Sequence, residues 1–299
     1  MEYVALGKSG LTSSVIGLGG GSSGRFGLTK GGTKADALRL IGTALDLGVT
    51  FFDGAGVAGG VDELLAEGLG SRRNEVLLST KVHLGPDPIV NSKLSNRVSS
   101  FTARRLGLVC SPGTLRKRIE RGLKALRTDR IDILHLHAVT AGQYSDAAKR
   151  ALPVLQEMKQ EGKLRAIGIT EGFLSDPQHK MLRAALADGG WDVVMVGFNP
   201  ANPSAAESVL PKAHRTGVGT IGMFALRRLL DGDAEGVDRR NLSDLAYRFS
   251  RQQAGMDVVL TGTGDAEHLK QNVASALSPP LAPDELEQLR NLTRTRRPR

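Results

Sequence analysis

The stretch that decides the fold is Gly48-Val49-Thr50-Phe51-Phe52-Asp53-Gly54-Ala55-Gly56-Val57-Ala58-Gly59. An apolar run ends in a carboxylate and passes into a Gly-rich turn, after which the helical pattern Val61–Leu69 begins. This order is typical of a buried strand that delivers an Asp to a turn before a helix. Because a charge at the end of a core strand is costly unless it is paired or used, Asp53 is a candidate site residue.

Two further apolar strands of the sequence end in the same way. One ends at Lys81 after Val76-Leu77-Leu78-Ser79-Thr80, and the other runs from Ile131 to His137. A carboxylate, an amine and an imidazole at strand ends indicate one shared site, in which Lys81 pairs with Asp53 and its charge lowers the pKa of a neighbouring acid.

Strand and helix patterns alternate along the whole chain of 299 residues. The predicted strands are Val15–Gly19, Val49–Asp53, Glu75–Lys81, Ile131–His137, Leu164–Ile169, Asp192–Gly197, Val218–Gly222 and Asp257–Thr261. The predicted helices are Lys34–Leu47, Val61–Leu69, Gly113–Leu126, Asp146–Glu161, Gln178–Ala187, Ser204–Thr216, Leu242–Gln253 and Ala266–Ala276. Eight such units without a break in composition predict an α/β protein, a single (β/α)8 TIM barrel over residues 1–299.

Four segments lie outside the predicted strands and helices of the eight units. Tyr3–Leu6, before Gly7-Lys8-Ser9-Gly10, predicts an N-terminal β-hairpin, and Asp284–Leu292 predicts a C-terminal closing helix. Residues 82–111 lack periodicity and follow a barrel strand, so we expect a long βα loop over the active face. The basic tail at residues 293–299 is expected to be disordered.

The composition limits the classes of partner. The net charge is +9, yet only 4% of the residues are aromatic and no nucleic-acid motif is present, so we expect no nucleic-acid partner. No run approaches about 20 apolar residues and no signal peptide is visible, so we expect no membrane association. The lone Cys110 fits a reducing compartment and predicts a cytoplasmic protein. We expect a small-molecule substrate and a monomer or small homo-oligomer.

Two motifs have readings that we do not favour. Gly19–Gly24 matches G-x-G-x-x-G, but a second Gly-rich stretch intervenes where a dinucleotide fingerprint needs a helix, so we expect a loop that can still touch a ligand. His135 and His137 form an H-x-H pair that could bind a metal. No further ligands are obvious and Lys81 would oppose a cation, so we expect no metal, with His137 at the rim and His135 packed beneath it.

A third motif lies near the C-terminus. The strand Asp257–Thr261 passes through Gly262-Thr263-Gly264 into the helix at Ala266, and backbone N–H groups there suit a phosphate. An ordinary Gly-rich loop is the alternative.

Together these residues resemble the aldo-keto reductase superfamily over nearly the whole chain. The similarity rests on motifs in the right order and spacing: Gly7-Lys8-Ser9-Gly10-Leu11, Phe51-Phe52-Asp53, Ser79-Thr80-Lys81, Asp129-Arg130-Ile131-Asp132 leading to His137, Gly162–Gly168, and Gly262-Thr263-Gly264 leading to His268-Leu269 and Asn272.

The resemblance implies a barrel that binds extended NADP(H), with hydride transfer to a carbonyl carbon and a Tyr that protonates the oxygen. Asp53, Lys81 and His137 match three of the four catalytic roles. The position of the Tyr holds Ala58, so this is an atypical member in which His137, His83 or Tyr144 could replace the acid.

The same resemblance assigns the cofactor-binding positions. At the nicotinamide end, Thr170-Glu171 replaces a Ser-Asn pair and Met195 a Gln, while Met223 takes the place of a ring-stacking Tyr that Phe224 or Phe198 could replace. Gly262 and His268 stand where many members grip the 2′-phosphate with Lys and Arg. The implied cofactor is NADP, with NAD possible. The full set is Thr170, Glu171, Met195, Met223, Phe224, Leu226, Gly262, Thr263, Gly264, His268, Gln271 and Asn272.

The leading interpretation is an oxidoreductase of specialised metabolism that transfers hydride between a nicotinamide cofactor and a small organic carbonyl, imine or alcohol. One alternative keeps the barrel for a non-redox elimination, dehydration or isomerisation. Another is a non-catalytic nucleotide-binding protein.

Overall fold

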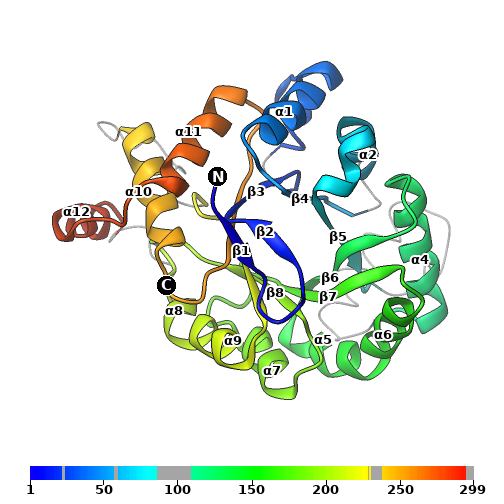
Figure 1. The fold of residues 1–299 in the computed structure, drawn as a ribbon. Coiled ribbons are helices and arrows are strands. Elements are labelled where there is room, and N and C mark those ends of the chain that lie inside the picture. Colours follow the sequence, from blue (N-terminus) through cyan, green and yellow to red (C-terminus); the bar gives the residue numbers. More distant parts are fainter. Residues whose placement is uncertain (22–23, 57–59, 86–108, 228, 230–237, 294–299) are drawn as a thin grey trace.

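Eight parallel strands close into a barrel in the computed structural model (Figure 1). The structure describes residues 1–21, 24–56, 60–85, 109–227, 229 and 238–293. The last strand pairs with both its predecessor and the first barrel strand, which closes the sheet. The predicted (β/α)8 barrel is therefore confirmed. Its strands are β3 (Ile16–Gly19), β4 (Phe51–Asp53), β5 (Leu77–His83), β6 (Ile131–Val139), β7 (Leu164–Glu171), β8 (Val193–Gly197), β9 (Gly219–Met223) and β10 (Val258–Thr261).

Helices surround the barrel on the outside (Figure 1). They are α1 (Lys34–Asp46), α2 (Val61–Leu69), α4 (Pro112–Ala125), α5 (Ala141–Asp146), α6 (Leu152–Gln160), α7 (Lys180–Asp188), α8 (Ala205–Ser208), α9 (Leu210–Thr216), α10 (Arg239–Arg251), α11 (Ala266–Leu277) and α12 (Pro283–Thr293). The short helical segments are η1 (Leu28–Lys30), η2 (Gly70–Glu75) and the π-helical η3 (Ala147–Ala151). The predicted closing helix corresponds to α12.

One predicted helix begins earlier than expected and another is interrupted. In place of Asp146–Glu161, the chain is helical without a gap from Ala141 to Gln160, as α5, η3 and α6, and the π-helical η3 lies just before Pro153 of α6. The expected helix Ser204–Thr216 is divided at Val209 between α8 and α9, with Pro211 at the start of α9. Proline has no N–H to donate to the preceding turn, which accounts for the irregular helical hydrogen bonding before each Pro.

Strand side chains alternate between the barrel interior and the helical layer. Phe51, Leu77 and Ile133 belong to an inner apolar cluster, whereas Phe52 and Leu78 belong to the larger outer core. By the same alternation, Lys81 and His83 of β5 and His135 and His137 of β6 face the interior. The barrel interior is therefore apolar at one end and carries the ionisable residues at the other.

A hairpin covers the apolar end of the barrel. Strands β1 (Tyr3–Ala5) and β2 (Thr12–Ser14) pair antiparallel as predicted, and Leu6 and Leu11 between them join the inner cluster. Figure 1 shows this hairpin in front of the barrel. The active face is left at the opposite end, as the fold requires.

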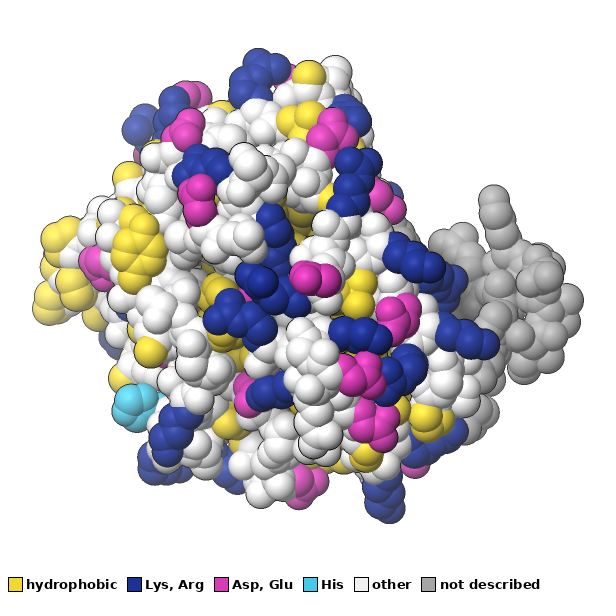
Figure 2. Space-filling model, turned by 45° about the vertical axis from the view of Figure 1, so that its right-hand side comes forward, with side chains coloured by type: hydrophobic (Ala, Val, Ile, Leu, Met, Phe, Trp, Pro, Cys, Tyr) yellow, Lys and Arg dark blue, Asp and Glu magenta, His cyan; other side chains and the backbone are white. Residues whose placement is uncertain are grey.

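The two ends of the predicted long loop lie together. The Cys110 N–H donates to the Leu84 carbonyl at 2.9 Å, and the Cys110 side chain is buried. Most of that loop (86–108) and nearly all of the basic tail (294–299) lie outside the described residues, so both expectations remain predictions. Across the part of the chain that is described, no helix combines the length and apolarity needed to cross a membrane. Figure 2 shows basic side chains interspersed with acidic ones on one face of the molecule.

Candidate active site

Asp53 and Lys81 form a buried ion pair at the carboxyl ends of β4 and β5. The Lys81 Nζ lies 2.5 Å from the Asp53 Oδ2 and also donates to the Gly54 carbonyl at 2.7 Å. The Ser79 hydroxyl donates to the second Asp53 oxygen at 3.0 Å. Asp53 is 3% and Lys81 8% exposed, so these partners compensate for the loss of water around both charges.

His137 lies at the end of the neighbouring strand and contacts His83, which sequence reasoning had not assigned a partner. Their ring nitrogens approach to 3.1 Å and their ring centroids to 4.3 Å. The register of β5 and β6 places His83 beside His137 and Lys81 beside His135. The imidazole pair therefore lies one inward-facing position closer to the rim than the Asp53–Lys81 pair.

His135 occupies the barrel interior beneath this pair. Its side chain is fully buried, and within the described part of the chain neither ring nitrogen has a hydrogen-bond partner. Burial, reinforced by the charge of Lys81, lowers the pKa of His135 well below its usual value. The ring lies against Gly168, where an added Cβ would come within 2.1 Å of Nδ1. Because Gly168 has no side chain, it leaves room for the neutral imidazole of His135.

Asp62 is a second buried carboxylate, at the start of α2. It accepts a hydrogen bond from the Thr80 hydroxyl at 2.9 Å, while its Oδ1 has no partner among the described residues. Burial raises the pKa of Asp62 to about 6. Thr80 alternates with the inward-facing Lys81, so Asp62 lies behind the barrel wall and anchors α2 rather than facing the interior.

The predicted adenosine-end residues gather in one cavity of about 1260 Å³. Seven cofactor candidates line it: Leu226, Gly262, Thr263, Gly264, His268, Gln271 and Asn272. The loop after β3 forms the opposite side, because Gly27 packs on Gly264 so closely that a Cβ on Gly264 would lie 2.3 Å from the Gly27 Cα. Lys30, Arg239 and Arg240 also line the cavity and were not predicted.

This cavity fits a nucleotide. The Asp265 side chain caps α11 by accepting from the His268 N–H, so a helix begins at the cavity wall. The Asn272 side chain donates to Thr261, which fixes the last strand to that helix. A helix N-terminus and a glycine-only contact between two loops provide N–H groups and space for phosphates. The three cations could bind phosphate oxygens, and they line the cavity together with Asp238, Asp244 and Asp265. The Gly-rich stretch 27–32 belongs to the loop after the first barrel strand, which the sequence predicted as a loop that can still touch a ligand.

The predicted nicotinamide-end residues lie apart from that cavity, on β7, β8 and β9. Met195 and Met223 belong to the inner cluster, and Phe224 packs against it. The Phe224 ring lies 5.5 Å from the Phe173 ring and carries the Arg227 guanidinium at 4.5 Å. Phe224 has a φ of 70°, an unfavourable conformation for a non-glycine residue, and such strain concentrates at functional sites.

Thr170 and Glu171 are both occupied by protein groups. The Thr170 hydroxyl accepts from the Ala138 N–H at 2.7 Å. The Glu171 carboxylate contacts the His179 Nδ1 at 2.9 Å and accepts from the Gly197 N–H, and burial raises its pKa. The predicted cofactor contacts of these two residues therefore require either a second hydrogen bond or a change of partner.

Tyr144 was an alternative for the proton donor and Phe198 for the ring-stacking residue, but both side chains contact outer helices. The Tyr144 hydroxyl donates to Asp188 of α7 in the helical layer, and burial raises the pKa of Tyr144 to about 12. Phe198 is buried and stacks on Phe249 of α10 at 5.5 Å. Tyr144 is therefore a poor proton donor and Phe198 a poor stacking partner. Ala58 lies outside the described residues, and among those described no three His, Cys, Asp or Glu residues gather to hold a metal.

The profile of the Aldo/keto reductase family matches residues 15–236, so the chain belongs to this family. It is 27% identical over 304 residues to L-galactose dehydrogenase of Arabidopsis thaliana, covering 92% of this chain and 88% of that protein. It is 25% identical over 317 residues to pyridoxal 4-dehydrogenase of Microbacterium luteolum, covering 91% and 92% respectively. An aldo-keto reductase from Bacillus halodurans in its holo form shares the fold, with a TM-score of 0.75 at 20% identity over 98% of this chain and 96% of that one.

Proposed function

We propose that this protein is an oxidoreductase that transfers hydride between NADP(H) and a small organic carbonyl, imine or alcohol. The observation that carries the proposal is the buried Asp53–Lys81 pair at one end of a closed barrel, in a chain of the Aldo/keto reductase family. When bound, the cofactor supplies the hydride for the carbonyl carbon. The residues of the chain then have to place a proton on the oxygen.

The proton donor in this proposal is the His83–His137 pair. The family's Tyr position holds Ala58, and Tyr144 is bound to Asp188. Two imidazoles in contact at 3.1 Å hold a proton between them when one ring is protonated, and they lie at the rim above Lys81. His83→Asn and His137→Asn are expected to lower kcat for carbonyl substrates by about 10²-fold or more.

An iminium substrate separates proton donation from hydride transfer. Because an iminium carries its proton already, both histidine variants should reduce it at nearly the wild-type rate. Equal losses with carbonyl and iminium substrates would contradict the assignment of the histidine pair. Ala58→Tyr, which restores the family's acid, is expected to raise carbonyl reduction.

The preference for NADP(H) rests on cations outside the usual loop. Gly262 and His268 replace the Lys and Arg that many members use, but Lys30 of η1 and Arg239 and Arg240 of α10 line the same cavity. Among the described residues none of the three has an ion-pair partner. Lys30→Gln and Arg239→Gln should raise KM for NADPH more than KM for NADH; equal effects on both cofactors would contradict the preference.

The test of the function combines binding with turnover. The protein is titrated with NADPH or NADH by fluorescence, and cofactor consumption is followed at 340 nm against a panel of carbonyls and imines. Binding with consumption supports the oxidoreductase, and Lys81→Met should abolish consumption while leaving binding intact. We further propose cytoplasmic localisation, a small-molecule substrate, and a monomer or small homo-oligomer.

The absence of the family's Tyr favours a second candidate function. A barrel without a strong proton donor suits an elimination, dehydration or isomerisation in which Lys81 or His137 acts as the base. Conversion of substrate without net consumption of cofactor would support this candidate. Cofactor binding without any conversion would instead support a nucleotide-binding protein.

A further inference from the structure

A second hollow lies on the outside of the barrel, between α7 and the α8–α9 pair, and shares no lining residue with the nucleotide cavity. We call it the α7–α9 groove; its volume is about 870 Å³. On the α7 side, the small side chains of Ala184 and Ala187 lie beside Lys180 and Arg183. The residues that define it are Lys180, Arg183, Ala184 and Ala187 of α7 and Lys212 and Arg215 of α9.

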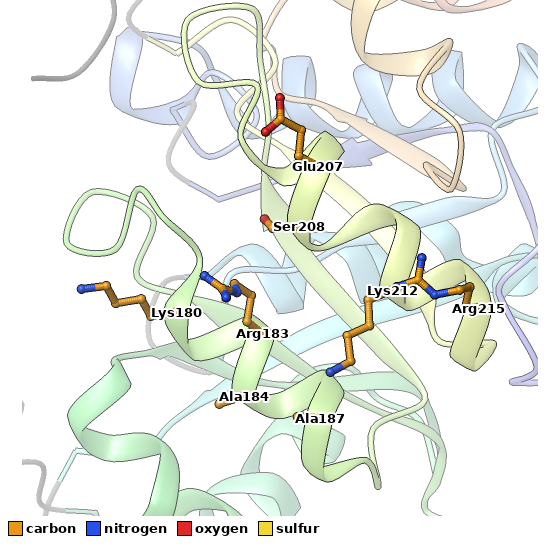
Figure 3. Close-up of a pocket in the computed structure, with 8 residues that line it drawn as sticks. All are labelled: Lys180, Arg183, Ala184, Ala187, Glu207, Ser208, Lys212 and Arg215. Atoms are coloured by element: carbon orange, nitrogen blue, oxygen red, sulfur yellow. The ribbon is translucent and has the colours of Figure 1, made fainter.

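Cations lie on both sides of this groove. Figure 3 shows Arg183 and Lys212 extending into the space between the two helices, whereas Glu207, the one acidic residue of the lining, points away from them. Within the described part of the chain, none of the four basic side chains forms an ion pair with a carboxylate. Like charges that face each other across a groove destabilise it unless an anion lies between them.

Three other contacts between neighbouring outer helices pair a cation with a carboxylate. Lys34 of α1 pairs with Glu67 of α2 at 2.7 Å, and Arg116 of α4 pairs with Glu157 of α6 at 3.0 Å. Arg248 of α10 pairs with Glu285 of α12 at 2.5 Å. At these three contacts the cation has a carboxylate partner on the neighbouring helix, whereas at the α7–α9 groove none of the four cations has such a partner among the described residues.

We propose that the α7–α9 groove binds a small phosphorylated molecule. A guanidinium and an ammonium are the side chains that proteins use for phosphate oxygens, and Arg183 and Lys212 supply one of each from the two sides of the groove. Among the described residues, no aromatic or large apolar side chain lines the groove, so it lacks the anchors of a protein interface and the stacking surfaces of a nucleic-acid site.

The experiment is a calorimetric titration of the full-length protein with inorganic pyrophosphate and with glycerol phosphate, at constant ionic strength and with NADPH saturating the nucleotide cavity. We expect saturable binding to the wild type. The double variant Arg183→Gln/Lys212→Gln should bind about 10- to 100-fold more weakly, because each cation contributes a charge-assisted hydrogen bond.

The matched control is Lys117→Gln/Arg121→Gln, which removes two exposed cations from α4 and should bind like the wild type. Thermal unfolding provides a second measurement: pyrophosphate should raise the Tm of the wild type and of the control, but not of the groove variant. The proposal is overturned if the wild type shows no saturable binding, if the groove variant binds equally well, or if an acidic peptide binds the groove in preference to the phosphates.

Discussion

At the scale of single residues, variants of the Asp53–Lys81 pair should affect stability and activity differently. Removing one partner leaves a buried charge uncompensated, which typically costs about 3–5 kcal/mol. Lys81→Met and Asp53→Asn should therefore both lower the free energy of unfolding measured with urea. The double variant should recover most of that loss, because no buried charge remains, yet stay inactive. A double variant as unstable as Lys81→Met would show that the pair is not the source of the cost.

For His135 we expect the opposite effect, namely that replacing the side chain stabilises the protein. A buried imidazole without partners opposes folding, so His135→Leu should raise the free energy of unfolding by about 1–3 kcal/mol. Because the pKa of His135 is lowered in the folded state, the unfolded chain binds its proton first as the pH falls. The wild type should then lose stability relative to His135→Leu below about pH 6.5, by about 1.4 kcal/mol per pH unit.

Urea unfolding of both proteins between pH 8 and pH 5 measures this difference. A His135→Leu variant that is less stable than the wild type at every pH would mean that the ring has a partner in solution.

At the scale of elements, the hairpin β1–β2 depends on one glycine. Gly7 has a φ of 52°, and an added Cβ would lie 2.4 Å from the Gly217 carbonyl oxygen. Gly10 has a φ of 74° but nothing within 4 Å. Both Gly→Ala variants carry backbone strain of about 1–2 kcal/mol, and only Gly7→Ala adds a clash of about 1–3 kcal/mol. Thermal unfolding should show the larger loss for Gly7→Ala; equal losses would mean that the hairpin moves away freely.

The elements also show how far the sequence predicts the site. The positions of Asp53 and Lys81 at strand ends were predictable because each follows an apolar run. Parallel strands bring such ends to one rim of the barrel. The contact of His83 with His137 depends on the register of β5 and β6, which no local pattern encodes. Likewise Arg239 and Arg240 reach the nucleotide cavity only because α10 packs beside α11, a contact between segments of separate units. Pro211 marked the interruption between α8 and α9 in the sequence, but the apolar periodicity predicted one continuous helix there.

At the scale of the whole molecule, a ligand that binds only the folded barrel stabilises all of it. NADPH at 100 times its Kd should add about 2.7 kcal/mol to the free energy of unfolding. For a chain of 299 residues, that corresponds to a rise in Tm of about 4 °C. The measurement needs no substrate, so it tests nucleotide binding independently of turnover. Lys81→Met should show the full rise, because Lys81 does not line the nucleotide cavity.

The combined variant Lys30→Gln/Arg239→Gln should lose most of the NADPH-induced rise in Tm, while the α4 control Lys117→Gln/Arg121→Gln keeps it. Salt gives a further check on the same cations. Raising the ionic strength from about 0.1 M to 1 M shortens the Debye length from about 10 Å to 3 Å, so the rise at a fixed NADPH concentration should shrink for the wild type and change little for the cavity variant. A rise that is the same in all three proteins at both ionic strengths would place the nucleotide outside the cavity between the β3 loop and α11.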